Sequence, residues 1–159
     1  AKEMAVKPTH GVYPSTFENI ILHAKLKNGD EIVGQYNISH KIPRSKKFRI
    51  DKVCLESQNA NKNITANPDA IVKIGEADII LIGPGALHGS VLPNLLIDEI
   101  NEAILKSKAR KIYLANTAIK LSETRGFNLE DHIKQLISHT DPKIIDEIVV
   151  NNKALIFFL

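Results

Sequence analysis

The sequence predicts an α/β protein in which a Rossmann-like parallel sheet, built as β-α-β-α-β, follows a β-hairpin. Residues 78–82 form an apolar run that is too short for a helix and ends abruptly in a glycine loop. An amphipathic helix pattern follows, which is typical of a strand buried on both faces that leads into a helix. Strands and helices then alternate as far as residue 150. This alternation indicates a parallel sheet with helical crossovers.

Composition sets the class of protein. At 159 residues we expect residues 1–159 to form a single domain, and the 43% hydrophobic and 25% charged content is ordinary for a globular protein. The net charge of +3 is mild, so nucleic acid is not an expected partner. A single cysteine, Cys54, excludes an internal disulfide, and we predict that it is a small buried side chain. Without a signal peptide or an apolar run of about 18 residues, we expect a soluble cytoplasmic protein with no membrane partner.

Local signals place the individual elements. Residues 19–37 read as the hairpin, with Asn28-Gly29 at its turn, and residues 51–56 read as another strand. Asn67 can cap a helix that begins at Pro68, and Asn128 can cap a later helix that ends before Pro142. Between these caps we expect a helix over residues 94–108 and a strand over residues 111–116. A last strand is expected over residues 145–150.

Six basic residues between positions 40 and 52 admit two interpretations. They could form a phosphate- or RNA-binding patch, or a solvated connecting loop. The loop is favoured, because Phe48 is the one aromatic side chain available there for stacking and the run has no helical or strand period.

The loops after the parallel strands point to a binding site. Because the carboxyl ends of parallel strands meet at one edge, residues 83–90 and 116–127 are expected to face one another across a crevice. The glycine loop can bring a ligand close to backbone N–H groups, or it can be a tight turn without a ligand. His88 could be an acid/base group or a ligand contact, or an exposed histidine without a role. Asn116 could bond a ligand or close its strand.

The glycine loop matches neither standard phosphate-binding motif. A P-loop needs a lysine after its last glycine, but Ser90 follows Gly89, and the dinucleotide fingerprint needs glycine where His88 stands. The six histidines show no metal-ligand spacing, so no metal site is expected. His132 falls at the rim of an apolar helix stripe and is interpreted as a packed, hydrogen-bonded side chain.

Two segments resemble a known family. The run IGPGALHGSVLPNLL, a later strand ending in Asn116, and the segment LSETRGFNLEDH resemble the C-terminal half of the gluconeogenesis-factor (YvcK-like) branch of the CofD, or 2-phospho-L-lactate transferase, family. The earlier segment VYPSTFENIILHAKLKNGD is similar to that family as well. The resemblance implies that the chain is the C-terminal part of a larger CofD-like domain with a Rossmann-like fold.

The resemblance also implies a nucleotide-linked ligand. In the YvcK-like branch this is a UDP-sugar, bound by regulatory proteins of cell-envelope synthesis and gluconeogenic growth. In the CofD branch the family implies a phosphotransferase that uses a GDP-type nucleotide with Mg²⁺. The positions that we expect to contact the ligand are Gly83, Pro84, Gly85, Ala86, His88, Ser90, Asn94, Asn116, Glu123, Thr124 and Phe127.

Departures from the family pattern leave the function open between several hypotheses. Ala86, His88, Gly89, Arg125 and Phe127 replace the family's serine, tyrosine, threonine, aspartate and tyrosine. The family's N-terminal glycine loop is absent, so no catalytic residue is assigned. A UDP-sugar-binding regulatory protein is the leading hypothesis, a CofD-type transferase is the alternative, and a non-binding structural remnant that acts through a partner subunit is the third. A homodimer is left open.

Overall fold

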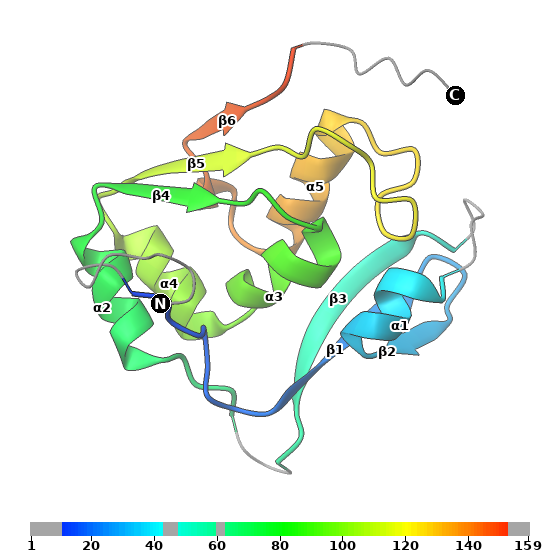
Figure 1. Cartoon of the computed structure of the whole chain (residues 1–159), viewed down its shortest axis with the longest axis horizontal. Helices are drawn as coiled ribbons and strands as arrows, with labels where there is room; N and C mark the ends of the chain where they lie inside the picture. The colour runs from blue at the N-terminus through cyan, green and yellow to red at the C-terminus, as the bar shows by residue number, and fades with distance from the viewer. Residues whose placement is uncertain (1–10, 43–47, 60–62, 153–159) are drawn as a thin grey trace.

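The first part of the chain forms an antiparallel sheet. A computed structural model describes residues 11–42, 48–59 and 63–152. The strands β1 (Ile20–Leu26), β2 (Glu31–Val33) and β3 (Ile50–Ser57) pair in the order β2-β1-β3, and the short helix α1 (Gln35–His40) lies between β2 and β3 in sequence. Figure 1 shows this sheet and α1 on one side of the molecule.

The second part forms the parallel sheet. Its elements in chain order are α2 (Pro68–Glu76), β4 (Ile79–Ile82), the π-helical turn η3 (Leu87–Val91), α3 (Leu92–Leu95), α4 (Asp98–Lys106), β5 (Arg110–Leu114), α5 (Leu129–His139), the 3-10 turn η4 (Pro142–Ile144) and β6 (Glu147–Val149). The strands β4, β5 and β6 are neighbours in that order and run parallel (Figure 1). The expected α/β fold, a Rossmann-like parallel sheet after a β-hairpin, is therefore confirmed.

Both predicted helix caps are confirmed. The Asn67 side chain accepts a hydrogen bond from the backbone N–H of Asp69, and Pro68 occupies the first helical position of α2. Asn128 and Asp131 form a reciprocal capping box at the start of α5. These signals depend on residues within one helical turn, which explains why the sequence alone could locate them.

Two predicted elements differ from the structure. The helix predicted over residues 94–108 is interrupted, because Ile97 adopts an extended conformation and buries its side chain in the core between α3 and α4. The hairpin is expected to extend to residue 37, but its return strand β2 ends at Val33, because Gly34, with a φ of 90°, turns the chain into α1. In both places the demands of packing override a local pattern.

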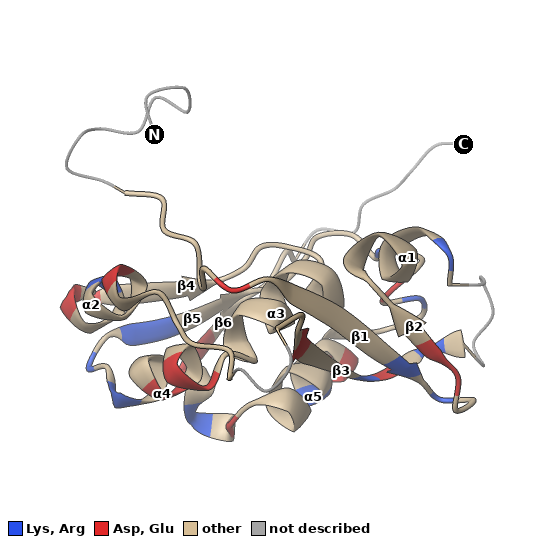
Figure 2. Cartoon of the chain, turned by 90° about the horizontal axis from the view of Figure 1, so that it is seen from below, with Lys and Arg blue, Asp and Glu red and all other residues tan. Residues whose placement is uncertain are grey.

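The parallel sheet is covered on one face only within the described residues. In Figure 2, α4 and α5 lie on the same side of β4, β5 and β6. The prediction that β4 is buried on both faces is wrong, because Ile79 and Leu81 are 55% and 57% exposed on the other side. Cys54 is also exposed rather than buried, because strand alternation turns Val53 into the core instead.

Other sequence expectations fall partly outside the described residues. Residues 43–47 of the basic run are not described. Acidic and basic residues are interspersed along the described chain (Figure 2). No helix in the described part of the chain is long and apolar enough to cross a membrane.

Gly83 is predicted to be required at the end of β4. Its φ is 91°, and an added Cβ would lie 2.9 Å from the carbonyl oxygen of Leu114 in β5. We expect Gly83→Ala to lower the free energy of unfolding by about 2–3 kcal/mol in urea titrations, because alanine is strained at this φ and contacts backbone that cannot move freely.

Gly75→Ala is the matched control for this substitution. Gly75 lies in α2, and beyond its own helix no atom lies within 4 Å of the position that an added Cβ would take. Alanine is therefore expected to be neutral there or to stabilise by up to about 1 kcal/mol. Equal stability of the Gly83 and Gly75 variants would contradict the assignment.

Candidate functional site

The two loops predicted to face one another are joined directly by hydrogen bonds. The Asn116 side chain accepts a hydrogen bond from the N–H of Gly85 at 3.2 Å and donates one to the carbonyl oxygen of Gly85 at 2.7 Å. This pair of bonds resembles a piece of sheet ladder between the end of β5 and the loop after β4. Both polar atoms of the Asn116 side chain are therefore used within the chain.

Glu123 makes the second connection between the loops. Its carboxylate, which is fully buried, accepts hydrogen bonds from the backbone N–H groups of His88 and Gly89 at 3.1 and 3.0 Å. Its other oxygen pairs with Lys120 Nζ at 2.7 Å and accepts a hydrogen bond from Ser39 Oγ at 3.3 Å. The carboxylate thus provides acceptors for these buried N–H groups of the η3 turn and connects the turn to α1.

His88 lies inside the protein. It is fully buried in η3, so the interpretation as an exposed loop histidine is wrong. Its Nε2 lies 3.1 Å from Gln135 Oε1 of α5. Burial lowers the pKa of His88 from its ordinary 6.5 to about 4, an effect that the Gln135 hydrogen bond only partly offsets. His88 is therefore a neutral packing residue at neutral pH.

The eleven residues expected to contact a ligand fall into separate environments. His88, Glu123 and Thr124 are buried in the interior, and the Thr124 hydroxyl donates to the carbonyl oxygen of Lys120. Gly83, Pro84, Ser90 and Asn94 line a cavity of about 330 Å³ beside β4. Asn116 and Phe127 line a different cavity of about 290 Å³ beyond the end of β5. Gly85 and Ala86 lie between these regions, where Gly85 bonds Asn116.

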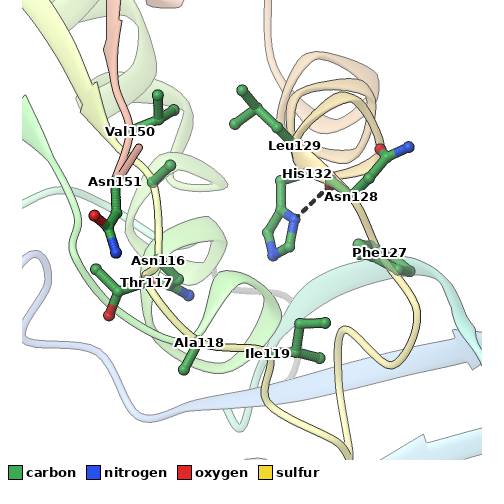
Figure 3. Close-up of a pocket in the computed structure, with 11 residues that line it drawn as sticks. Asn116, Thr117, Ala118, Ile119, Phe127, Asn128, Leu129, His132, Val150 and Asn151 are labelled. Carbon is green, nitrogen blue, oxygen red and sulfur yellow. Dashed lines mark hydrogen bonds between the residues drawn. The ribbon is translucent and has the colours of Figure 1, made fainter. Parts of the chain in front are cut away.

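The cavity beyond β5 lies at the carboxyl edge of the parallel sheet. Figure 3 shows that the segments after β5 and β6 and the beginning of α5 surround it. Its lining residues are Ala115, Asn116, Thr117, Ala118, Ile119, Phe127, Asn128, Leu129, His132, Val150 and Asn151. None of these described residues is an acid, a lysine or an arginine. This position is where open α/β sheets bind ligands.

His132 lines this cavity but is not among the residues that the sequence predicted for the site. It is 8% exposed, and its Nδ1 lies 2.9 Å from the carbonyl oxygen of Asn128 (Figure 3). The Phe127 ring meets the His132 ring edge-on, with the ring centroids 5.4 Å apart. The expected packed and hydrogen-bonded histidine is confirmed, but its position at a cavity follows from the fold rather than from any local pattern.

Arg49 supports the far side of this cavity wall. Its guanidinium lies 5.3 Å from the centroid of the Phe127 ring and donates a hydrogen bond to the carbonyl oxygen of Gly126. Gly126 has a φ of 67°, a left-handed conformation that glycine adopts without strain. One member of the basic run therefore has a structural contact.

A larger cavity of about 760 Å³ lies elsewhere, between α2 and α4. None of the residues predicted for the site lines it. Within the described residues, no group of three or more His, Cys, Asp or Glu side chains is placed to hold a metal ion. We therefore assign no step to a metal.

The fold and the edge cavity together define an α/β domain with an open space at the carboxyl edge of its parallel sheet. Comparisons with known proteins give its family. The family model described as 2-phospho-L-lactate transferase CofD matches residues 2–156, and the chain belongs to this family.

Its relatives include proteins called gluconeogenesis factor. The chain is 38% identical over 144 residues to the putative gluconeogenesis factor of Clostridium acetobutylicum, covering 91% of the chain and 31% of that relative. It is 34% identical to the gluconeogenesis factor of Bacillus subtilis, covering 91% and 43%. A crystal structure of a UPF0052 family member from Bacillus halodurans superimposes with a TM-score of 0.77 at 34% identity, covering 86% of this chain and 42% of that one. The chain therefore spans less than half the length of these relatives.

Removal of the Glu123 carboxylate is expected to destabilise the fold. Glu123→Ala leaves the N–H groups of His88 and Gly89 buried without acceptors, so we expect a loss of about 3 kcal/mol in urea unfolding. Glu130→Ala is the control, because Glu130 pairs with Lys134 on the exposed face of α5, and it is expected to change little. A Glu123→Ala variant as stable as the control would contradict the role assigned to this carboxylate.

The buried His88 is expected to make stability depend on pH. Between pH 6.5 and about pH 4, His88 is protonated in the unfolded chain but remains neutral in the folded chain. Stability should therefore fall across this window, by up to about 3 kcal/mol, and should not depend on His88 above it.

Urea titrations at several pH values check this expectation, with His88→Gln as the comparison. The variant should lose part of the slope between pH 6.5 and 4, because glutamine does not titrate. Parallel pH profiles for the two proteins would exclude His88 as a source of the acid sensitivity.

Proposed function

We propose that this chain contributes to a binding site for a UDP-sugar and acts as a regulatory protein rather than as an enzyme. The proposal includes a link to cell-envelope synthesis and central carbon metabolism. Two findings support it: the chain belongs to the CofD family, and the relatives compared above are called gluconeogenesis factors. The resemblance of the GPG run and the SETRG segment to the YvcK-like branch supports it further.

The edge cavity is the observation that carries the proposal. It combines apolar walls, from Ile119 and Phe127, with polar groups from Thr117, Asn128 and His132. Its volume of about 290 Å³ is at the lower end of the ~300–1,000 Å³ of small-molecule sites. A cavity of this size and lining suits one ring of a nucleotide-sugar, such as its base or its sugar, with the diphosphate outside.

A CofD-type phosphotransferase is the second candidate. The description of the matching family model, 2-phospho-L-lactate transferase CofD, favours it. A transferase of this kind would use a GDP-type nucleotide with Mg²⁺. The two candidates therefore differ in the base that is recognised and in the need for a divalent cation.

A structural remnant without ligand is the third candidate. Its supporting observation is that the polar atoms of Asn116 and Glu123 are already paired within the chain. These two residues match the family motif, but hydrogen bonding between the loops is sufficient to account for them. This candidate predicts a folded chain that acts through a partner subunit and binds no nucleotide.

A ligand panel separates the three candidates. Thermal unfolding of the chain is measured with UDP-glucose, UDP-N-acetylglucosamine, GDP and phosphate, each with and without Mg²⁺. At a ligand concentration of 100 times Kd, binding to the folded state adds about 2.7 kcal/mol, which raises Tm by roughly 5–10 °C. We expect the UDP-sugars to produce this shift without Mg²⁺.

Phosphate alone is the control for non-specific anion binding. A shift that appears only with GDP and Mg²⁺ would favour the transferase. The absence of any shift at millimolar ligand would contradict nucleotide binding by this chain and favour the remnant.

A further inference from the structure

One nitrogen of His132 lacks a hydrogen-bond partner at the edge cavity. Nε2 is closed off from solvent, and no donor or acceptor among the described residues bonds it. Figure 3 shows this nitrogen at the end of the ring that points toward the space between Asn116 and Ile119. A buried polar atom left unpaired costs about 1–3 kcal/mol. The position of His132 is therefore unfavourable unless a further group bonds Nε2.

The hydrogen bond of Nδ1 determines whether the partner of Nε2 is a hydrogen-bond donor or an acceptor. Nδ1 lies 2.9 Å from the carbonyl oxygen of Asn128, which can only accept a hydrogen bond. Nδ1 therefore carries the proton, and in the neutral ring Nε2 presents a lone pair. The partner of Nε2 must then be a hydrogen-bond donor, either N–H or O–H.

The surroundings of Nε2 indicate a neutral partner. The described residues that line the cavity include no lysine or arginine that could balance a phosphate. The beginning of α5 is unfavourable for an anion as well, because the capping box occupies the N–H groups of Asn128 and Asp131, and the carboxylates of Glu130 and Asp131 add negative charge there. Phe127, Ile119 and Leu129 provide apolar walls that suit a ring.

We propose that His132 recognises the ligand by accepting a hydrogen bond at Nε2 from an N–H or O–H group of a neutral ring bound in this cavity. The inference rests on the proposed function, which it deepens by assigning the ring of the ligand to this cavity and the specificity contact to His132. The donor is the N3–H of a uracil base or a hydroxyl group of the sugar. His88 also has an unpaired buried nitrogen, but it lines none of the cavities described above.

Two substitutions at position 132 separate the ring nitrogens. In His132→Asn the amide can still donate to the carbonyl oxygen of Asn128, but nothing replaces Nε2. In His132→Gln the longer side chain places an amide oxygen near the position of Nε2. We expect His132→Asn to weaken UDP-glucose binding about 10-fold in calorimetric titrations, and His132→Gln to restore most of the affinity. A structural role for His132 alone would not distinguish the two variants in this way.

Ligand analogues identify the source of the donor. If the base is the source, N3-methylation of uridine should weaken its binding to the wild-type chain at least 10-fold, on the order expected for one lost hydrogen bond to a buried acceptor. If the sugar is the source, uridine and 3-methyluridine should bind alike, and His132→Asn should weaken UDP-glucose but not UDP. The ¹⁵N spectrum of His132 gives a readout independent of affinity: Nδ1 protonated without ligand, and a shifted Nε2 resonance with it.

Three outcomes would overturn the inference. The first is a ring that carries its proton on Nε2 in the free chain. The second is UDP-glucose binding of equal strength to the wild type and to a folded His132→Asn variant, which leaves the proposed function standing. The third is the absence of binding by every probe, which overturns the proposed function as well. Binding of uridine that His132→Asn weakens, without binding of UDP-glucose, would instead support the role of His132 and contradict the UDP-sugar.

Discussion

The buried carboxylate of Glu123 is the interaction on which the edge of the parallel sheet depends. A buried charged group is tolerated only when it is paired and hydrogen-bonded. Here Lys120 forms the ion pair, and the N–H groups of the η3 turn donate the hydrogen bonds. Because the carboxylate comes from the loop after β5 while the turn follows β4, the two loops are held as one unit. Ser39 extends the same network to α1, so the antiparallel sheet is attached to this edge too.

This arrangement decides where open space remains. Asn116 and Glu123 connect the two loops directly by hydrogen bonds, so the loops are in contact at Gly85 and at the η3 turn. One cavity at this edge lies beyond the ends of β5 and β6, where α5 begins. A pattern of loop positions can therefore predict at which edge of a sheet a cavity lies, but not on which side of a loop it opens.

The features that could be predicted from the sequence are those that depend on residues close together in the chain. The caps at Asn67 and Asn128 involve neighbours within one turn, and the parallel direction of the strands follows from crossovers that the helix–strand alternation indicates. The break at Ile97 and the exposed outer face at Leu81 depend on what packs nearby in space, which a single sequence does not contain. The apolar run of β4 correctly predicts a strand, but its composition alone does not show whether one face or both faces are covered.

The same distinction applies to the site residues. A motif match marks a position, but it does not say whether the side chain serves the fold or a ligand. In Glu123 the polar atoms are fully used within the chain, so stability is enough to explain why a carboxylate is needed there. In His132 one ring nitrogen is hydrogen-bonded within the chain and the other is not, and the residue lines a cavity. Since an unpaired buried acceptor lowers stability, its place in the fold is better explained by an intermolecular contact than by packing. Neither part of this observation is sufficient alone, because His88 has an unpaired nitrogen without a cavity and Asn116 lines the cavity with every polar side-chain atom paired.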